Sequence, residues 1–244
     1  MSQILAQFQI ALMTLTRLPA GHIRGEVPQV ARSVWAFPVV GVIVGGLAAL
    51  VFVAATALGL PPSLAGLLAI AISVLATGAL HEDGLADLAD GFGGGHSIDR
   101  KLEIMRDSRI GSYGAVALIL SVGIRAVAIG ELQQAAWALI ALAAFSRGVI
   151  PLVMCWLPPA RADGLGRSAG AVSAQQCLIS LVLGAVAVVF LQASAFPVIL
   201  GMVVAAALVS LLAKRQIGGF TGDVLGATQQ VTEISGWLIL AAIS

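Results

Sequence analysis

A run of 23 residues without a charge, Pro38–Leu60, constrains this chain more than any other feature of its sequence. A helix of that length crosses the hydrocarbon core of a bilayer, which is about 30 Å thick. The run is not isolated, because 59% of the residues are hydrophobic and 10% are charged, whereas a soluble domain has about 25% charged residues. The sequence therefore predicts an all-α, polytopic membrane helix bundle in contact with lipid.

Six apolar segments are candidate transmembrane helices, and a short terminal segment, 237–243, would bring the number to about six to seven. The six segments are 38–60, 63–80, 111–130, 135–157, 177–191 and 195–213. Residues 3–16 are expected to form an amphipathic helix at the interface or a first, partly buried helix. We expect loops at 81–113, 158–170 and 214–233, with a surface helix in the first of them. One membrane domain, 1–244, accounts for this length.

The distribution of basic residues supports this topology. If the spans alternate, one side of the membrane receives 11 of the 13 basic residues: Arg17, Arg24, Arg32, Arg100, Lys101, Arg106, Arg109, Arg161, Arg167, Lys214 and Arg215. By the positive-inside rule that side is the cytoplasm. Because the net charge is only +1, no broad basic surface for nucleic acid is expected.

The stretch 81–95 concentrates carboxylates in a chain that has few of them. Glu82 lies there, and Asp83, Asp87 and Asp90 follow at helical positions i, i+4 and i+7, which share one face. Like charges so close repel one another, and a cation removes that cost. Oxygen ligands favour Mg²⁺, which completes its shell with water and phosphate oxygens. The alternative is a solvated loop that caps the second span.

Segment 99–114 mixes basic and acidic side chains. Lys101, Arg106 and Arg109 could hold phosphate opposite a metal, and Asp107 could bind the metal or orient an arginine. The alternative is an ordinary surface helix whose charges pair at i, i+3 and i+4.

A glycine-rich stretch, Gly218–Gly226, presents one carboxylate, Asp223, together with backbone N–H groups such as that of Gly222. The alternative is a turn with a capping aspartate. If one metal–phosphate site uses both acidic motifs, Asp223 must lie beside the 81–95 stretch.

Three further polar residues adjoin or enter the apolar runs. Arg125 and Arg147 lie inside expected spans, where a charge faces either a protein interior or a polar cavity. Arg147 is the better candidate for a phosphate site, and pairing within the bundle is the alternative. His81 could serve as a general base or as a plain hydrogen-bonding group.

Three ordered motifs, 81–92, 101–114 and 219–227, resemble the cobalamin synthase family of adenosylcobinamide-GDP ribazoletransferases. The segments 16–19 and 37–41 are similar to it too. The resemblance implies a Mg²⁺-dependent enzyme of the bacterial inner membrane with its active site facing the cytoplasm. Its substrates would be adenosylcobinamide-GDP and α-ribazole (or its 5′-phosphate), and its products adenosylcobalamin (or its 5′-phosphate) and GMP. The sequence leaves open a homo-oligomer or a complex with other corrinoid enzymes.

The residue patterns and the resemblance together predict roles for individual residues. The metal ligands would be Glu82, Asp83, Asp87, Asp90 and Asp223. The catalytic residues would be His81, Asp83 and Asp87. The substrate-binding residues would be Lys101, Arg106, Asp107, Arg109, Arg147 and Gly222.

Two rival functions are weighed against this one. A CDP-alcohol phosphotransferase of phospholipid synthesis carries an acidic motif that begins like residues 87–91 of this chain. In that motif Ala-Arg and two later aspartates follow, and both are missing here. A cation transporter is expected to carry acids within its spans and to contain broken helices. In this chain the acidic residues lie at the ends of the expected spans, and the charged residues inside the spans are arginines.

Overall fold

The computed structural model describes residues 3–23, 25–161 and 169–243, and every regular element in these ranges is a helix. Among the residues discussed above, Arg24 and Arg167 lie outside the described residues. The helices are α1 (Gln3–Leu15), α2 (Val30–Ser33), α3 (Phe37–Ala57), α4 (Pro62–Thr77), α5 (Leu80–Gly94), α6 (Ile98–Ile104), α7 (Ser112–Glu131), α8 (Ala135–Gly148), α9 (Ile150–Trp156), α11 (Ala174–Val189), α12 (Ala195–Ile217) and α13 (Gly222–Ile243). The predicted all-α bundle is confirmed.

Four helical segments of the described chain are long and apolar enough to cross a bilayer. They are Val30–Ala57, Ser112–Glu131, Ala135–Trp156 and Gln192–Ile217. Helices α4 and α5 make a fifth span if this bent pair is counted as one. The number is below the six to seven expected, because α4 and α11 have 16 residues each, about 24 Å of helix.

Large apolar side chains cover the outside of the bundle and are more than 40% exposed. They include Val116, Ile119 and Leu120 on α7, Leu178, Val182 and Val186 on α11, and Leu200, Val204 and Leu208 on α12. Apolar side chains this exposed are stable in lipid and costly in water. Inside the bundle, Gly41 and Gly45 let α3 approach the backbone of α8, where added Cβ atoms would lie 2.3 Å and 2.5 Å from carbonyl oxygens. Such small-residue contacts are typical of membrane helix packing.

A sharp bend separates α4 from the acidic helix α5. The two helix axes differ by 92°, and the residues between them, Gly78 and Ala79, have φ values of 65° and 60°. This left-handed conformation ends α4, and it costs about 1–2 kcal/mol at an alanine. The expected second span therefore ends at Thr77, and the acidic stretch forms a helix of its own.

The expectation of a loop over 214–233 is wrong. Helix α12 continues to Ile217 and α13 begins at Gly222, so only four residues separate them. The terminal segment 237–243 is the end of α13. Gln229 and Gln230 of α13 instead contact Ser146, Ser121 and Glu82 of other helices, which sequence periodicity does not reveal.

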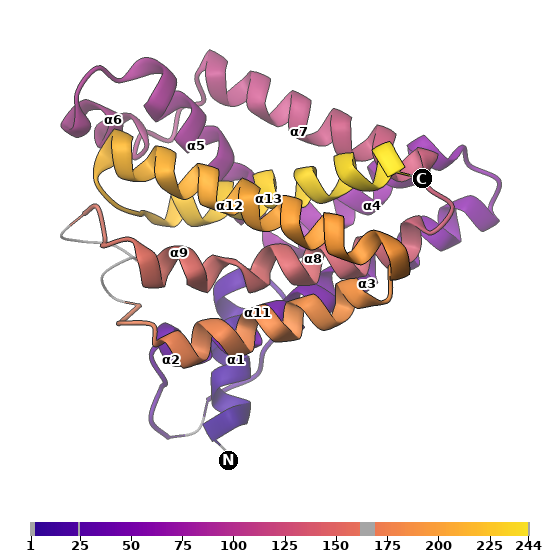
Figure 1. Cartoon of the computed structure of the whole chain (residues 1–244), viewed down its shortest axis with the longest axis horizontal. Coiled ribbons are helices and arrows are strands. Elements are labelled where there is room, and N and C mark those ends of the chain that lie inside the picture. The colour runs from indigo at the N-terminus through magenta and orange to yellow at the C-terminus, as the bar shows by residue number, and fades with distance from the viewer. Residues whose placement is uncertain (1–2, 24, 162–168, 244) are drawn as a thin grey trace.

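The two ends of the bundle differ in chemistry. Figure 1 shows α6, the turn between α12 and α13 and the end of α9 together at the left, and the C-terminus with the α3–α4 and α11–α12 connections at the right. The basic residues of α6 and Lys214 and Arg215 at the end of α12 thus lie at the same end of the molecule. For Arg100, Lys101, Lys214 and Arg215, this agrees with the arrangement that the charge distribution predicted.

Candidate active site

Two glycines allow α5 and α13 to cross in direct contact. A Cβ atom added to Gly84 would lie 2.9 Å from the carbonyl oxygen of Asp223 and 3.1 Å from the Cα of Gly226. One added to Gly226 would lie 3.3 Å from the Cα atoms of Gly84 and His81. A larger residue at either position would push the helices apart. The crossing places Asp223 beside the acidic helix, as the sequence predicted.

Three carboxylates meet at this crossing, and we call Asp83, Asp87 and Asp223 the acidic site. Asp83 is exposed, while Asp87 and Asp223 are half-buried. The negative charge of Asp87 is destabilised by burial and then by Asp83, Asp223 and Asp90. Asp223 is in turn destabilised by burial and by Asp83. Accessible carboxylates that repel one another in this way gain stability from a bound cation.

Arg161 supplies a positive charge at the edge of the acidic site. Its Nη1 lies 3.6 Å from Oδ2 of Asp223, and its Nη2 donates a hydrogen bond to the carbonyl oxygen of Leu102 at 3.0 Å. Phe220 forms two backbone hydrogen bonds with 158–160, of 2.9 Å and 2.8 Å, which hold the loop that carries Arg161 against the start of α13. Sequence reasoning missed this residue, because nothing in the sequence pairs the two loops.

Asp90 caps α7 in this structure. Its Oδ2 accepts the N–H of Gly111 at 2.7 Å, and its Oδ1 accepts the N–H of Gly114 at 2.9 Å. Added Cβ atoms at Gly111 and Gly114 would each lie 2.4 Å from an oxygen of Asp90, so both positions require glycine. A carboxylate that binds the first N–H groups of a helix also complements the helix dipole. Asp90 thus has a structural partner for each oxygen, unlike the exposed Asp83.

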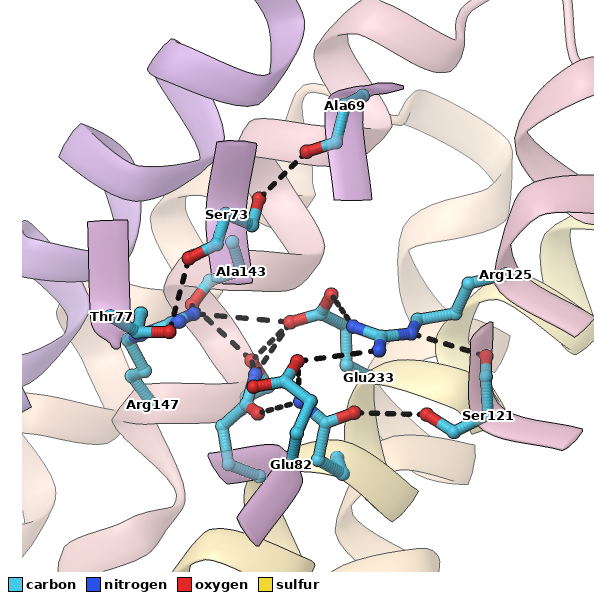
Figure 2. A network of polar contacts seen from close by, with 12 residues as sticks. Ala69, Ser73, Thr77, Glu82, Ser121, Arg125, Ala143, Arg147 and Glu233 are labelled. Carbon is cyan, nitrogen blue, oxygen red and sulfur yellow. Dashed lines mark hydrogen bonds and ion pairs between the residues drawn. The ribbon is translucent and has the colours of Figure 1, made fainter. Parts of the chain in front are cut away.

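Glu82 points away from the acidic site into a buried network of charges. Its Oε1 lies 3.4 Å from Nη2 of Arg125 and accepts a hydrogen bond of 2.9 Å from Gln230. Figure 2 shows Glu233 between Arg125 and Arg147, with carboxylate–guanidinium distances of 3.6 Å and 3.8 Å. Two carboxylates and two guanidinium groups balance one another, which a buried set of charges requires.

The buried network ties four helices together around the first turn of α5. Glu82 belongs to α5, Arg125 to α7, Arg147 to α8 and Glu233 to α13. Both arginines are 3% exposed, and Nη1 of Arg147 also donates to the carbonyl oxygen of Ala143 at 3.0 Å. Arg147 therefore adopts the alternative of pairing within the bundle. The network fixes α5 after the bend and so positions the acidic site.

The basic residues expected to clamp a phosphate lie on and after α6. Lys101 donates a hydrogen bond to Gln216 of α12, and Arg106 is exposed just after α6. Arg109 pairs with Asp107 at 2.6 Å. Hydrogen bonds from the Arg109 side chain lower the pKa of Asp107 to about 2. Asp107 thus orients an arginine, which is one of the two roles predicted for it.

His81 and Gly222 adjoin the acidic site without making a polar contact in it. His81 is 2% exposed and its Nε2 has no hydrogen-bond partner. Gly222 is exposed, and an added Cβ atom would meet nothing within 4 Å. Both residues line one cavity together with Asp83 and Asp223.

The carboxylate oxygens of the acidic site are donors of the type that Mg²⁺ takes. Among the described residues, no group of three or more His, Cys, Asp or Glu side chains is placed so that it could by itself hold a metal ion. Mg²⁺ is usually held by one or two carboxylates and keeps waters and substrate phosphate oxygens as its other ligands. Asp83, Asp87 and Asp223 can supply such carboxylates, whereas Glu82 and Asp90 are engaged elsewhere.

Sequence reasoning also missed the polar residues of α13 that enter the buried network. Gln229 and Glu233 are one helical turn apart, and Gln230 contacts Glu82 and Ser121. Their i, i+4 spacing within an otherwise apolar segment was a usable signal for a helix with one polar face. It was obscured by the expectation of a loop over this range.

The fold and the acidic site define an all-α membrane protein with a carboxylate-rich site where two helices cross. The chain belongs to the CobS family, Cobalamin-5-phosphate synthase, whose family model matches residues 7–241. It is 48% identical to the adenosylcobinamide-GDP ribazoletransferase of Mesorhizobium japonicum, over 97% of this chain and 93% of the relative. The proteins of the same name from Bradyrhizobium diazoefficiens and Azorhizobium caulinodans are 45% and 44% identical, over 98% and 96% of this chain and 94% of each relative. No solved structure matches the chain.

Proposed function

We propose that this chain is an adenosylcobinamide-GDP ribazoletransferase that uses the acidic site. The family and the names of its relatives support the activity. The structural observation that supports the site most directly is the contact between α5 and α13 at Gly84 and Gly226. This contact joins carboxylates from two distant parts of the chain in one accessible place, as transfer of a phosphate group requires.

The reaction exchanges one phosphoester linkage for another. A ribose hydroxyl of α-ribazole, or of its 5′-phosphate, attacks the phosphorus atom attached to the corrinoid side of the diphosphate. A new P–O bond forms to the ribose oxygen, and the P–O bond to the second phosphate breaks. GMP leaves with the bridging oxygen, and the hydroxyl proton passes to a base.

The residues of the acidic site suit the roles of base and ligand. Asp83 is the most accessible carboxylate of the three, and it or Asp87 receives the proton of the attacking hydroxyl. Arg161, beside Asp223, is placed to contact a phosphate oxygen. The chemistry that Mg²⁺ supplies when bound is neutralisation of the charge on the diphosphate oxygens. His81 is buried, which favours Asp83 and Asp87 as proton acceptors.

The proposed location is the bacterial inner membrane, with the acidic site open to the cytoplasm. The support is the positive-inside rule, because the basic residues of α6 and of the end of α12 lie at one end of the bundle. The bulky, charged corrinoid nucleotide would then reach the site from the aqueous side.

The test is incubation of the purified protein with adenosylcobinamide-GDP, α-ribazole and Mg²⁺, followed by chromatography. We expect equal amounts of GMP and of the complete corrinoid. CDP-alcohol in place of the corrinoid tests phospholipid synthesis, and an ion-flux assay in liposomes tests transport. Product in either of these two assays, with none from the corrinoid, would refute the proposed function.

A further inference from the structure

A cavity opens directly beside the acidic site and is walled mainly by apolar side chains. Its volume is about 150 Å³. The apolar wall is drawn from α1, α3, α5, α9, α13 and the segments around them, and includes Leu15, Phe37, Leu80, Ile150, Met154 and Leu225. Phe37 and Ile150 are 3% and 2% exposed, so their part of the wall belongs to the packed interior, whereas Leu80 is exposed at its edge.

The polar part of the same wall includes two carboxylates and one imidazole. Asp83 and Asp223 of the acidic site line it. His81 lines it as well, and its buried Nε2 lacks a hydrogen-bond partner. Gly222 leaves open space where any other residue would place a side chain. The cavity thus combines an apolar wall with two carboxylates and an unused imidazole nitrogen.

This combination selects a flat, largely apolar ligand with a polar end. An apolar cavity of about 150 Å³ accepts a benzene-sized ring, and a cavity open to one side accommodates the rest of a larger bicyclic ring. The dimethylbenzimidazole base of α-ribazole is such a ring, and its free ring nitrogen can accept a hydrogen bond. The guanine of the corrinoid nucleotide is also a flat bicyclic ring, but its edge carries polar carbonyl and amino groups, which an apolar wall disfavours.

We propose that this cavity binds the dimethylbenzimidazole base of the ribazole substrate, an inference that depends on the proposed function. With the base in the cavity, the attached ribose extends toward Asp83 and Asp223, which brings its hydroxyl to the carboxylates. The apolar wall therefore determines which nucleoside acts as the nucleophile, while the acidic site determines which bond is made.

Gly222→Leu adds an apolar side chain to the lining of the cavity, and an added Cβ atom at this position meets no atom within 4 Å. The matched control is Gly123→Leu, at an exposed glycine of α7 where an added Cβ also meets nothing within 4 Å. We expect Gly222→Leu to weaken α-ribazole binding by about tenfold or more and to leave the KM for adenosylcobinamide-GDP within about twofold. Gly123→Leu should change neither value.

Binding is measured by equilibrium dialysis of labelled α-ribazole with the purified full chain, without turnover, and both KM values come from GMP release. In the wild-type protein, free 5,6-dimethylbenzimidazole should compete with α-ribazole and not with the corrinoid nucleotide. This measurement does not depend on the folding of a variant.

The outcomes separate this inference from the proposed function. If the wild-type protein binds α-ribazole and Gly222→Leu does not, the inference about the cavity is supported. If the same wild-type protein also transfers nothing, only the proposed function is refuted. Transfer activity with equal ribazole binding in wild type and Gly222→Leu refutes the cavity and leaves the function intact. The inference is also overturned if free 5,6-dimethylbenzimidazole competes with the corrinoid nucleotide. It is overturned as well if Gly222→Leu displaces a co-purified lipid and leaves ribazole binding unchanged.

Discussion

Replacing Gly84 by alanine should separate the two helices that form the acidic site. The new methyl carbon would lie 2.9 Å from the carbonyl oxygen of Asp223 and 3.1 Å from the Cα of Gly226. Both are backbone atoms, which cannot rotate away. Ordinary contact begins at 3.4 Å, so α13 must move by about 0.5 Å.

The displacement has a cost in stability and a larger consequence for catalysis. Overpacking of this kind destabilises a protein by about 1–3 kcal/mol. A misplacement of about 1 Å costs about 100-fold in rate, so half of it should cost about tenfold. The KM values should change less than kcat, because the acidic site lies where the reacting bond is made rather than where the substrates gain most of their binding energy.

The assay is the initial rate of GMP release by purified protein, with thermal unfolding measured on the same samples. Gly94→Ala is the control, since it adds the same methyl group to the same helix but meets only Cδ1 of Ile104, at 3.6 Å. Its rate should match the wild-type rate. A Gly84→Ala protein with the wild-type kcat would refute the claim that contact between α5 and α13 positions the carboxylates.

Three other substitutions test separate parts of the structure. Asp83→Asn should lower GMP release by about 100-fold or more while the protein still inserts in membranes and unfolds at the wild-type temperature; near-normal release would contradict its role. Glu233→Leu leaves Arg125 and Arg147 without their shared carboxylate and should destabilise the protein by about 3–5 kcal/mol, seen as a lower unfolding temperature; an unchanged temperature would show that the buried network is not structural. Gly114→Ala puts a methyl carbon 2.4 Å from Oδ2 of Asp90 and should destabilise by about 1–3 kcal/mol, and equal stability would argue against the cap on α7.

The sequence predicted those features that depend on local pattern. Charge-free runs such as Pro38–Leu60 can only be satisfied by helices in a bilayer, so the all-α membrane class followed directly. The proximity of Asp223 to the acidic helix followed from chemistry, because one phosphate-transfer site needs both motifs. The glycines at the crossing, Gly84 and Gly226, were visible in the sequence only as parts of those motifs.

Features that depend on contacts between distant segments could not be predicted. The two backbone partners of Asp90 lie 21 and 24 residues further along the chain, and the sequence does not reveal them. The position of Asp90 on the same helical face as Asp83 and Asp87 was the only signal, and it suggested a metal ligand. Glu82 is adjacent to Asp83, but successive helical residues differ by about 100° in direction, and Glu82 turns toward Arg125 instead. The polarity of α13 resembled a loop because its partners belong to α5, α7 and α8.

The central claim is that Asp83 and Asp223, from two distant parts of the chain, jointly bind one divalent cation for the transfer. Its most direct test is the binding of Mn²⁺ in place of Mg²⁺, measured by electron paramagnetic resonance on the purified protein with adenosylcobinamide-GDP present. We expect saturable Mn²⁺ binding in the wild-type protein and a clear loss of affinity in both Asp83→Asn and Asp223→Asn. Unchanged Mn²⁺ affinity in the two variants would contradict the claim.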